Sequence, residues 1–260
     1  MNPDALKSFQ SRSLALVERH PVVVNNAYTA AFARGGFSLD DIRHFTVQFS
    51  VFSHLFIEAQ LLKCINSRNL KSYRASKEIL MNELGVIFTE RGSVDGGRFR
   101  FAAGHFEWLT EFASHLGLSF DRIGKRRFAT RATVFFCDEL TRLYGSDDFS
   151  VAHGASFAIE HWAAAGFWKE LITGLSDFKR REVPELPLGF WTWHDQLEQR
   201  HAEHTDDELL TAYRTPGFRD EAFLQGAVEL LDAVQRFWEG LLADRNPAST
   251  RWAPGLGESA

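Results

Sequence analysis

The sequence predicts an all-α protein, a single bundle of about seven core helices. Long segments carry apolar residues three and four positions apart, which places them on one face of a helix, and almost no segment alternates like a half-buried strand. Hydrophobic residues make up 45% of the chain and charged residues 24%, an ordinary globular balance. No repeat and no linker interrupts the pattern, so residues 1–246 are expected to form one helical domain, followed by a frayed tail over 247–260.

The first long helix is predicted to begin at Ser38 and to continue to about residue 66. Ser38 is a suitable N-cap, and Asp40 and Asp41 supply the acidic first turn that favours a helix N-terminus. Neither glycine nor proline interrupts this segment. It is therefore expected to be a long core helix.

The same reasoning gives the remaining elements, which are helices over 104–118, 119–145 and 151–175, from about 190 onwards, and over 216–245. The segment 151–175 is expected to tolerate glycines within its helical period. Pro184 and Pro187 punctuate the chain before the helix that begins near residue 190. Residues 86–104, rich in glycine and of mixed charge, are predicted to be a partly ordered loop between two core helices.

Segment 194–204, HDQLEQRHAEH, concentrates three histidines and two glutamates in one predicted helix. His194, Glu198 and His201 stand at i, i+4 and i+7, so they share one helix face. Imidazole and carboxylate together suit iron, manganese or zinc, and helical bundles hold such metals with inward-pointing side chains spaced in this way. His204 continues the stripe, so Glu198, His201 and His204 form an alternative register. A solvated polar face is the competing explanation, because the neighbouring residues are polar too.

Other predicted helices offer further ligands. Glu58 lies in HLFIEAQLL and Glu160 in SFAIEHWAAAGF, apolar runs in which a buried carboxylate needs a partner or a metal. His105 opens HFEWLTEF, and Glu83 lies in ILMNELGVIF. Taken singly, Glu83 is explained by an exposed last turn and His105 by a helix start. Together with segment 194–204, these residues supply four carboxylates and three histidines, close to the inventory of a carboxylate-bridged dimetal site.

This arrangement resembles the haem-oxygenase-like dimetal oxidases and oxygenases, seven-helix proteins with a non-haem diiron site inside a haem-oxygenase-type bundle. The resemblance covers about Val17–Arg245. The stretch ERHPVVVNNAYTAAFARGGFSLDDIRHFTVQFSVFSHLF is similar to the family's His-Pro, small helix, glycine turn and first core helix. HFEWLTEFASHLGL, FAIE and HDQLEQRH are similar to the family's His-bearing helix, its later glutamate and its His-x3-Asp-x2-His triplet.

The resemblance implies two iron ions, labile or tightly held, that cycle between Fe(II) and Fe(III) and use O2 as co-substrate. It implies the metal ligands Glu58, Glu83, His105, Glu160, His194, Glu198 and His201. Two features depart from the family pattern. Glu198 stands where aspartate is usual, and the interval between Glu83 and His105 is unusually long. We therefore expect residues 86–104 either to form a lid or to displace Glu83 from the site.

The implied activity is oxygenation or oxidation of a small amine or amino-acid-like metabolite. A carboxylate at the position of Glu83 is associated with N-oxygenating relatives, which favours N-oxygenation through a peroxo-diferric intermediate. The alternative is hydrogen abstraction with C–C cleavage, which forms alkenes or nitriles. Expected partners are a small-molecule substrate and an external electron donor, and homodimers are common among relatives. Arg98 and Arg100 are candidates for gripping a substrate carboxylate, or are solvated loop charges.

Tryptophans flank several of the implied ligands and are candidates for the walls of a cavity, although core packing explains them equally well. They are Trp162, Trp168, Trp191 and Trp193.

Composition excludes several other classes of protein. The net charge of −5 offers no basic footprint for nucleic acid, and no apolar run approaches the roughly 18 residues of a membrane span. Cys64 and Cys137 are too few for a disulfide framework. These observations predict a cytoplasmic protein with no nucleic-acid or membrane partner.

Metal-free proteins of the same fold are the remaining alternatives. A thiaminase-like hydrolase needs a nucleophilic cysteine, whereas Cys137 in TVFFCDEL has apolar neighbours. A haem oxygenase needs a proximal histidine near the N-terminus, and His20 is followed directly by proline. A cofactorless oxidase, or a helical binding protein that uses the His/Glu stripe as a surface, would leave the carboxylate set without a metal.

Overall fold

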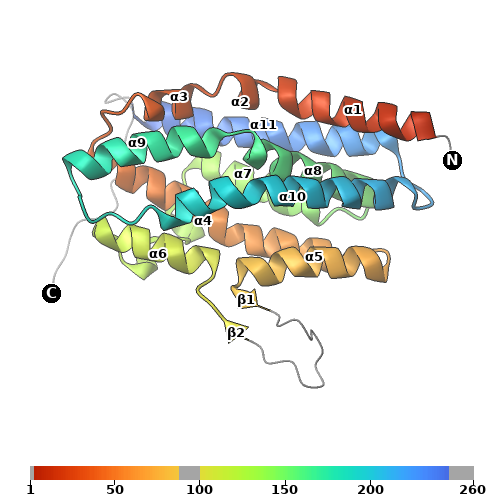
Figure 1. The fold of residues 1–260 in the computed structure, drawn as a ribbon, viewed down its shortest axis with the longest axis horizontal. Coiled ribbons are helices and arrows are strands. Elements are labelled where there is room, and N and C mark those ends of the chain that lie inside the picture. The colour runs from red at the N-terminus through yellow and green to blue at the C-terminus, as the bar shows by residue number, and fades with distance from the viewer. Residues whose placement is uncertain (1–2, 88–99, 246–260) are drawn as a thin grey trace.

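The computed structural model describes the backbone of residues 3–87 and 100–245, without the side chains of residues 3, 87, 100, 101 and 197–204. This part of the chain forms eleven α-helices, two short strands and two 3-10 turns (Figure 1). In chain order the elements are α1 (Pro3–Arg19), α2 (Pro21–Val24), α3 (Ala27–Ala33), α4 (Leu39–Ile65), α5 (Leu70–Glu83), β1 (Val86–Ile87), β2 (Arg100–Phe101), α6 (His105–His115), two 3-10 turns (Phe120–Arg122 and Arg126–Phe128), α7 (Arg131–Tyr144), α8 (Phe149–Ala164), α9 (Phe167–Arg181), α10 (Gly189–Tyr213) and α11 (Asp220–Asp244).

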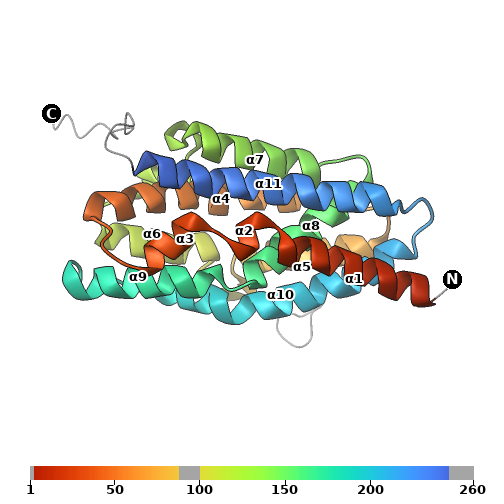
Figure 2. The ribbon, with the colours of Figure 1, turned by 90° about the horizontal axis from the view of Figure 1, so that it is seen from above.

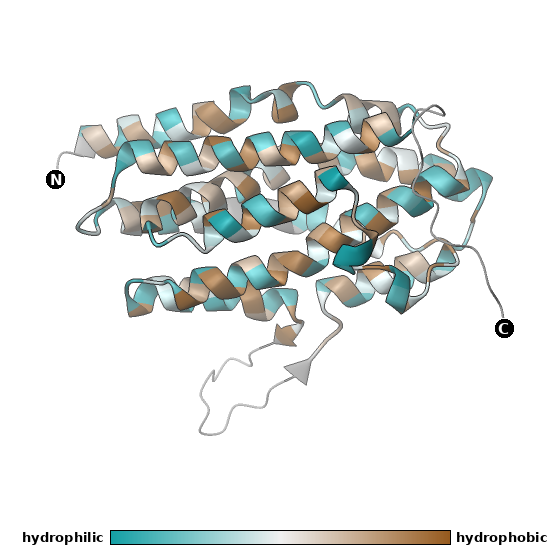
Figure 3. Ribbon diagram, turned by 180° about the vertical axis from the view of Figure 1, so that it is seen from behind, coloured by the Kyte–Doolittle hydropathy of each residue, from teal (hydrophilic) through white to brown (hydrophobic). Residues whose placement is uncertain are grey.

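The long helices lie along a common axis (Figures 1 and 2). Helix α8 packs against both α10 and α11, and α4 packs against α5 and α7. Helices α1, α2 and α3 lie alongside α11 on one side of the bundle (Figure 2). Each helix carries hydrophobic and hydrophilic residues along its length, as Figure 3 shows. Because the described residues are mainly helical, with only two strands of two residues each, the predicted all-α class is confirmed.

The core is built largely from aromatic rings. Phe49 of α4 lies 5.1 Å from Trp191 of α10 and 5.9 Å from Trp168 of α9, measured between ring centroids. Phe45, one turn earlier, lies 5.3 Å from Trp191. Tilted and edge-on ring pairs of this kind stabilise a core beyond the area that they bury. Three helices are thereby joined at the level of the candidate site.

The predicted start of α4 is confirmed in detail. The Ser38 hydroxyl accepts a hydrogen bond from the Asp41 amide at 3.2 Å, and the Asp41 carboxylate accepts one from the Ser38 amide at 3.0 Å. This reciprocal capping box satisfies two backbone donors that the helix itself cannot pair.

Two of the predicted helices are corrected by the structure. The segment 151–175 is not continuous, because Gly166 adopts a left-handed backbone with φ of 99° and separates α8 from α9. The segment 119–145 opens with the two 3-10 turns, and its α-helix starts only after the N-cap Thr130. The break at Gly166 is one reason that eleven α-helices stand in the described residues where about seven core helices were predicted.

In the segment 86–104, predicted to be a loop, the residues described at its two ends include a pair of short strands. Val86 pairs with Phe101 and Ile87 with Arg100 in an antiparallel ladder. Residues 88–99, including Arg98, and the predicted tail 247–260 lie outside the described residues. No helix in the described ranges has both the length and the apolar character that a bilayer span requires.

The first prediction concerns the close contact between α8 and α11. A Cβ atom at Gly154 of α8 would overlap the backbone carbonyl of Phe223 on α11. We expect Gly154→Ala to lower the free energy of unfolding by about 1–3 kcal/mol, because the two helices would have to separate. Urea unfolding measures this difference. Gly189→Ala is the matched control, since no heavy atom lies within 4 Å of the added carbon, and an equal loss in both variants would contradict the argument.

Candidate metal centre

His194 is held inside the bundle in a defined tautomer. It lies on the first turns of α10 and is 8% exposed. Its Nδ1 lies 2.6 Å from the Phe190 carbonyl oxygen. A carbonyl oxygen only accepts, so Nδ1 carries the proton and donates it, which leaves the lone pair on Nε2. Metal-binding histidines are typically oriented by such a bond from the second ring nitrogen.

Glu83 and His105 meet in spite of the insertion between them. A Glu83 carboxylate oxygen lies 2.8 Å from His105 Nδ1, and the two side chains are 11% and 4% exposed. The β1–β2 ladder closes the base of the insertion, and the Ala102 amide donates to the Gly85 carbonyl at 2.8 Å. The last turn of α5 and the first turn of α6 are therefore adjacent. The insertion does not displace Glu83 from His105.

The spacing of this pair suits two ligands of one metal ion. Oxygen and nitrogen ligands lie roughly 2.1 Å from a first-row metal, so two of them at right angles are roughly 3 Å apart. The 2.8 Å separation between Glu83 and His105 fits that requirement. The contact is close in distance but lacks the geometry of a hydrogen bond, so His105 Nδ1 is a buried nitrogen with no hydrogen-bond partner among the described residues.

Three of the predicted ligands line one cavity of about 60 Å³, namely Glu83, Glu160 and His194. The His105 ring lies beside it, with its centroid 4.9 Å from that of His194. Glu160 is 4% exposed. The other walls are mainly aromatic and are formed by Phe49, Phe52, Phe56, Trp162, Trp168 and Phe190. The structure thus brings four of the seven predicted ligands together in a largely apolar interior.

Glu58 does not join them, which corrects the prediction. It is exposed on α4, and its charge acts on Arg126 and Cys137. The α4 residues at the cavity include Phe52 and Phe56. Glu58 follows Phe56 by two positions, or roughly 200° around the helix, so it faces away.

The last two predicted ligands cannot be placed from their side chains. Glu198 and His201 lie on the described backbone of α10, but their side chains are outside the described residues, as is that of His204. Among the side chains that are described, no three His, Cys, Asp or Glu groups lie close enough together to hold a metal ion. Binding of two metal ions would therefore need Glu198 and His201, which follow His194 on one helix face.

Tryptophan rings hold the two histidines in place. Trp168 stacks on His194 with the centroids 4.9 Å apart and the planes at 28°. Trp193 meets His105 edge-on at 4.5 Å. Of the tryptophans predicted as cavity walls, Trp162 and Trp168 line the cavity, whereas Trp191 packs in the core against Phe45 and Phe49.

Sequence reasoning missed a buried polar group farther along the bundle. Lys63 of α4 and Glu208 of α10 form an ion pair of 2.7 Å and are 2% and 8% exposed. The available signal was the helical register, since Lys63 follows Phe56 by seven positions and Glu208 follows His201 by seven. Lys63 therefore continues the α4 face that carries Phe56, and Glu208 continues the α10 stripe of predicted ligands.

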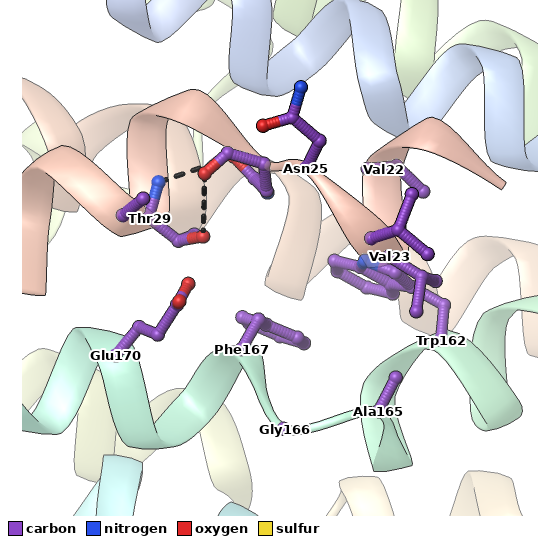
Figure 4. Close-up of a pocket in the computed structure, with 12 residues that line it drawn as sticks. Val22, Val23, Asn25, Thr29, Trp162, Ala165, Gly166, Phe167 and Glu170 are labelled. Atoms are coloured by element: carbon purple, nitrogen blue, oxygen red, sulfur yellow. Dashed lines mark hydrogen bonds between the residues drawn. The ribbon is translucent and has the colours of Figure 1, made fainter. Parts of the chain in front are cut away.

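A second pocket of about 180 Å³ lies where α2 and α3 meet the junction of α8 and α9 (Figure 4). Glu170 extends from α9 towards Thr29 on α3. Trp162 lines both this pocket and the candidate metal cavity, and stacks on Phe167 at 4.4 Å. Among the described lining residues, Glu170 is the one titratable group. The pocket therefore lies behind the cavity wall and contains none of the predicted ligands.

Comparison with known proteins places this arrangement in a fold. A domain of unknown function with a haem oxygenase-like fold from Shewanella denitrificans matches 95% of this chain and 98% of its own, with a TM-score of 0.65 and 14% identity. The chain has a haem-oxygenase-like fold. A CADD-like protein of unknown function from Nostoc punctiforme matches with a TM-score of 0.65 and 16% identity over 92% of this chain and 98% of that one. A TenA homolog from Pseudomonas syringae matches with a TM-score of 0.63 and 13% identity over 92% of this chain and 92% of that one.

Sequence comparison adds nothing to this assignment. No family model matches the chain, and no curated protein matches it. At 13–16% identity the solved structures show the shared fold alone. The haem-oxygenase-like bundle predicted from the sequence is thus confirmed, and the chemistry of the site is considered separately below.

The buried cysteines make the second prediction. Burial raises the pKa of Cys137 to about 12, and burial also raises the pKa of Cys64. Both thiols therefore stay protonated near neutral pH. We expect the native protein to resist thiol reagents and to gain two reactive thiols on unfolding, which a colorimetric thiol assay with and without denaturant measures. Rapid reaction of Cys137 in the native protein would contradict this prediction and support the alternative of a cysteine-dependent hydrolase.

Proposed function

We propose that the protein is a dimetal, O2-activating oxidase or oxygenase that acts on a small amine or amino-acid-like metabolite. The observation that carries this proposal is the meeting of Glu83, His105, Glu160 and His194 in one aromatic-walled interior. Buried carboxylates and imidazoles are costly unless they pair or bind a metal. Mixed oxygen and nitrogen ligands in a helical bundle are the setting of carboxylate-bridged diiron sites.

Each side chain has a definite part in this proposal. His194 would bind through Nε2, because the Phe190 carbonyl holds the Nδ1 proton. Glu83 and His105 would bind one ion from adjacent positions, and Glu160 would bind from α8. Glu198 and His201 are proposed to complete the set from α10. Two iron ions bound in this way would supply electrons to O2, and an external donor would restore them.

The aromatic walls would protect this chemistry. Phe52, Phe56 and Trp168 line the cavity with apolar surface, which would lower the local dielectric around the bound metals. Stacking of Trp168 on His194 limits rotation of the imidazole. The ligands would therefore be oriented before the metals bind.

Within this class we favour N-oxygenation. The support is the resemblance, which associates a carboxylate at the position of Glu83 with N-oxygenating relatives, together with the contact between Glu83 and His105. Oxidative C–C cleavage would use the same ligands and is distinguished by its product, an alkene or a nitrile in place of an N–O compound. Product analysis by mass spectrometry after incubation with 18O2 and candidate amines separates the two reactions.

The third prediction concerns iron binding. We expect the purified protein to bind about two Fe(II) per chain under anaerobic conditions and then to consume O2. His194→Ala should abolish binding of at least one iron, because it removes the Nε2 ligand. His115→Ala, at an exposed position of α6, is the control and should bind iron as the wild type does. Absence of iron binding in the wild type would instead favour a metal-free helical binding protein.

The fourth prediction tests whether Glu160 is a metal ligand and Glu58 is not, as the structure indicates, although the sequence analysis predicted both as ligands. Glu160→Ala should weaken Fe(II) binding at least about tenfold, because it removes a buried carboxylate at the cavity. Glu58→Ala should leave the affinity unchanged, because Glu58 is exposed and faces away. Anaerobic titration with a competing chelator measures both affinities. If Glu58→Ala weakened Fe(II) binding as much as Glu160→Ala, Glu58 would have to be counted among the metal ligands.

A further inference from the structure

The candidate metal cavity, at about 60 Å³, has little room for an organic substrate. For comparison, a cavity of roughly 150 Å³ holds a molecule of the size of benzene. A pocket of about 180 Å³ adjoins the cavity where α2 and α3 meet the junction of α8 and α9, and Trp162 forms part of both walls (Figure 4). This space, named the Glu170 pocket below, has room for a ligand of roughly six to eight non-hydrogen atoms.

Glu170 supplies the one charge among the side chains that line this pocket, all of which are described. It is half-buried, and its side chain extends from α9 towards Thr29 (Figure 4). Neither a lysine nor an arginine lines the pocket with it. A half-buried carboxylate attracts a cation more strongly than a fully exposed one, because less water screens the charge. The pocket therefore favours a ligand that carries a positive charge.

Two N–H groups without acceptors border the same pocket. The Trp162 Nε1 and the Asn26 Nδ2 are buried and have no hydrogen-bond partner among the described residues. The Asn26 amide is held in this orientation because its oxygen accepts from the Tyr28 and Thr29 amides at 3.1 and 3.2 Å. Trp162 is 2% exposed, and Figure 4 shows its nitrogen beside Val23, which also lines the pocket. Buried donors of this kind favour an occupant that carries a hydrogen-bond acceptor.

An aromatic pair separates the pocket from the metal cavity. Trp162 and Phe167 stack with their centroids 4.4 Å apart and their planes at 9°. Trp162 also lines the cavity together with Glu160 and His194. A ligand in the pocket and a metal ion in the cavity would therefore contact the same side chain.

A second hollow beside the centre also contains a single carboxylate. It measures about 390 Å³, is lined by Glu111, Trp108 and Trp193, and shares Phe190 with the metal cavity. Glu111 is exposed, so solvent screens its charge. None of the side chains that line this hollow has a buried N–H without a partner. The Glu170 pocket is therefore the better candidate, and Glu111 provides a matched control.

We propose that the Glu170 pocket binds a small primary amine as its ammonium ion. Glu170 accepts hydrogen bonds from the ammonium group, and Trp162 and Asn26 donate to a hydroxyl or carbonyl oxygen of the same molecule. The class of ligand is thus an amino alcohol or an amino amide with a positive net charge. The identification of this ligand with the substrate, bound beside the centre before it reaches the metals, rests on the proposed function.

The fifth prediction tests recognition of the charge with three probes of equal chain length. 4-Aminobutanol carries an ammonium group and a hydroxyl, butane-1,4-diol lacks the charge, and butylamine lacks the hydroxyl. The full-length chain, without added iron and with 15N-labelled tryptophan, is titrated with each probe and followed by NMR. 4-Aminobutanol should bind at least about tenfold more tightly than the diol, because a charge-assisted hydrogen bond is stronger than a neutral one. Butylamine should bind less tightly than 4-aminobutanol.

Variants and individual resonances locate the bound amine. Glu170→Gln keeps the size of the side chain and removes its charge, so the preference for 4-aminobutanol over the diol should disappear. Glu111→Gln should leave both affinities unchanged. In the wild type, 4-aminobutanol should shift the indole N–H resonance of Trp162, identified by its loss in Trp162→Phe. The resonances of Trp108 and Trp193, which line the other hollow, should stay in place.

Two results would overturn the inference. One is an equal affinity of the wild type for 4-aminobutanol and the diol, or no binding of either. The other is loss of the preference in Glu111→Gln with a shift of the Trp108 resonance, which would place the ammonium group in the hollow beside α6.

Because amine binding is measured without added iron, the outcomes separate the two proposals. A chain that binds Fe(II) and consumes O2, but does not bind the amine at Glu170, would overturn this inference and leave the proposed function standing. A chain that binds the amine at Glu170 but binds no iron would overturn the proposed function and support an amine-binding helical protein.

Discussion

The contact between Glu83 and His105 is the constraint on which the candidate centre depends. The two residues end one helix and begin another, and their carboxylate oxygen and ring nitrogen lie 2.8 Å apart across the base of an insertion. The antiparallel pair of β1 and β2 closes that base. Because the entropic cost of a loop grows slowly with its length, an insertion closed in this way lengthens the chain without separating the residues on either side.

The aromatic interior limits where polar groups can be buried in the bundle. Phe49 joins Trp168 and Trp191, and Trp168 stacks on His194, so the same packing that stabilises the core also orients a predicted ligand. Such an interior offers few hydrogen-bonding partners to an isolated charged side chain. The predicted ligands around the cavity form one buried polar group, and the Lys63–Glu208 pair forms another.

The limits of prediction follow from the range of each interaction. The start of α4 is encoded locally in Ser38 and Asp41, so it could be predicted correctly. The break at Gly166 could not, because a glycine within an apolar helical period is compatible with either a continuous helix or a left-handed turn. Glu58 and Glu160 look alike in sequence, each an acid in an apolar run, yet only Glu160 lines the cavity.

Helical periodicity and capping act between near neighbours in the chain, so the local sequence specifies the all-α class, the main helices and the placement of His194, Glu198 and His201 on one helix face. Packing between helices brings Glu83 to His105, turns Glu58 away from the site and pairs Lys63 with Glu208. These outcomes depend on which face each helix presents to its neighbours. That rotation is set by the packing of side chains from several helices at once, and no single segment encodes it.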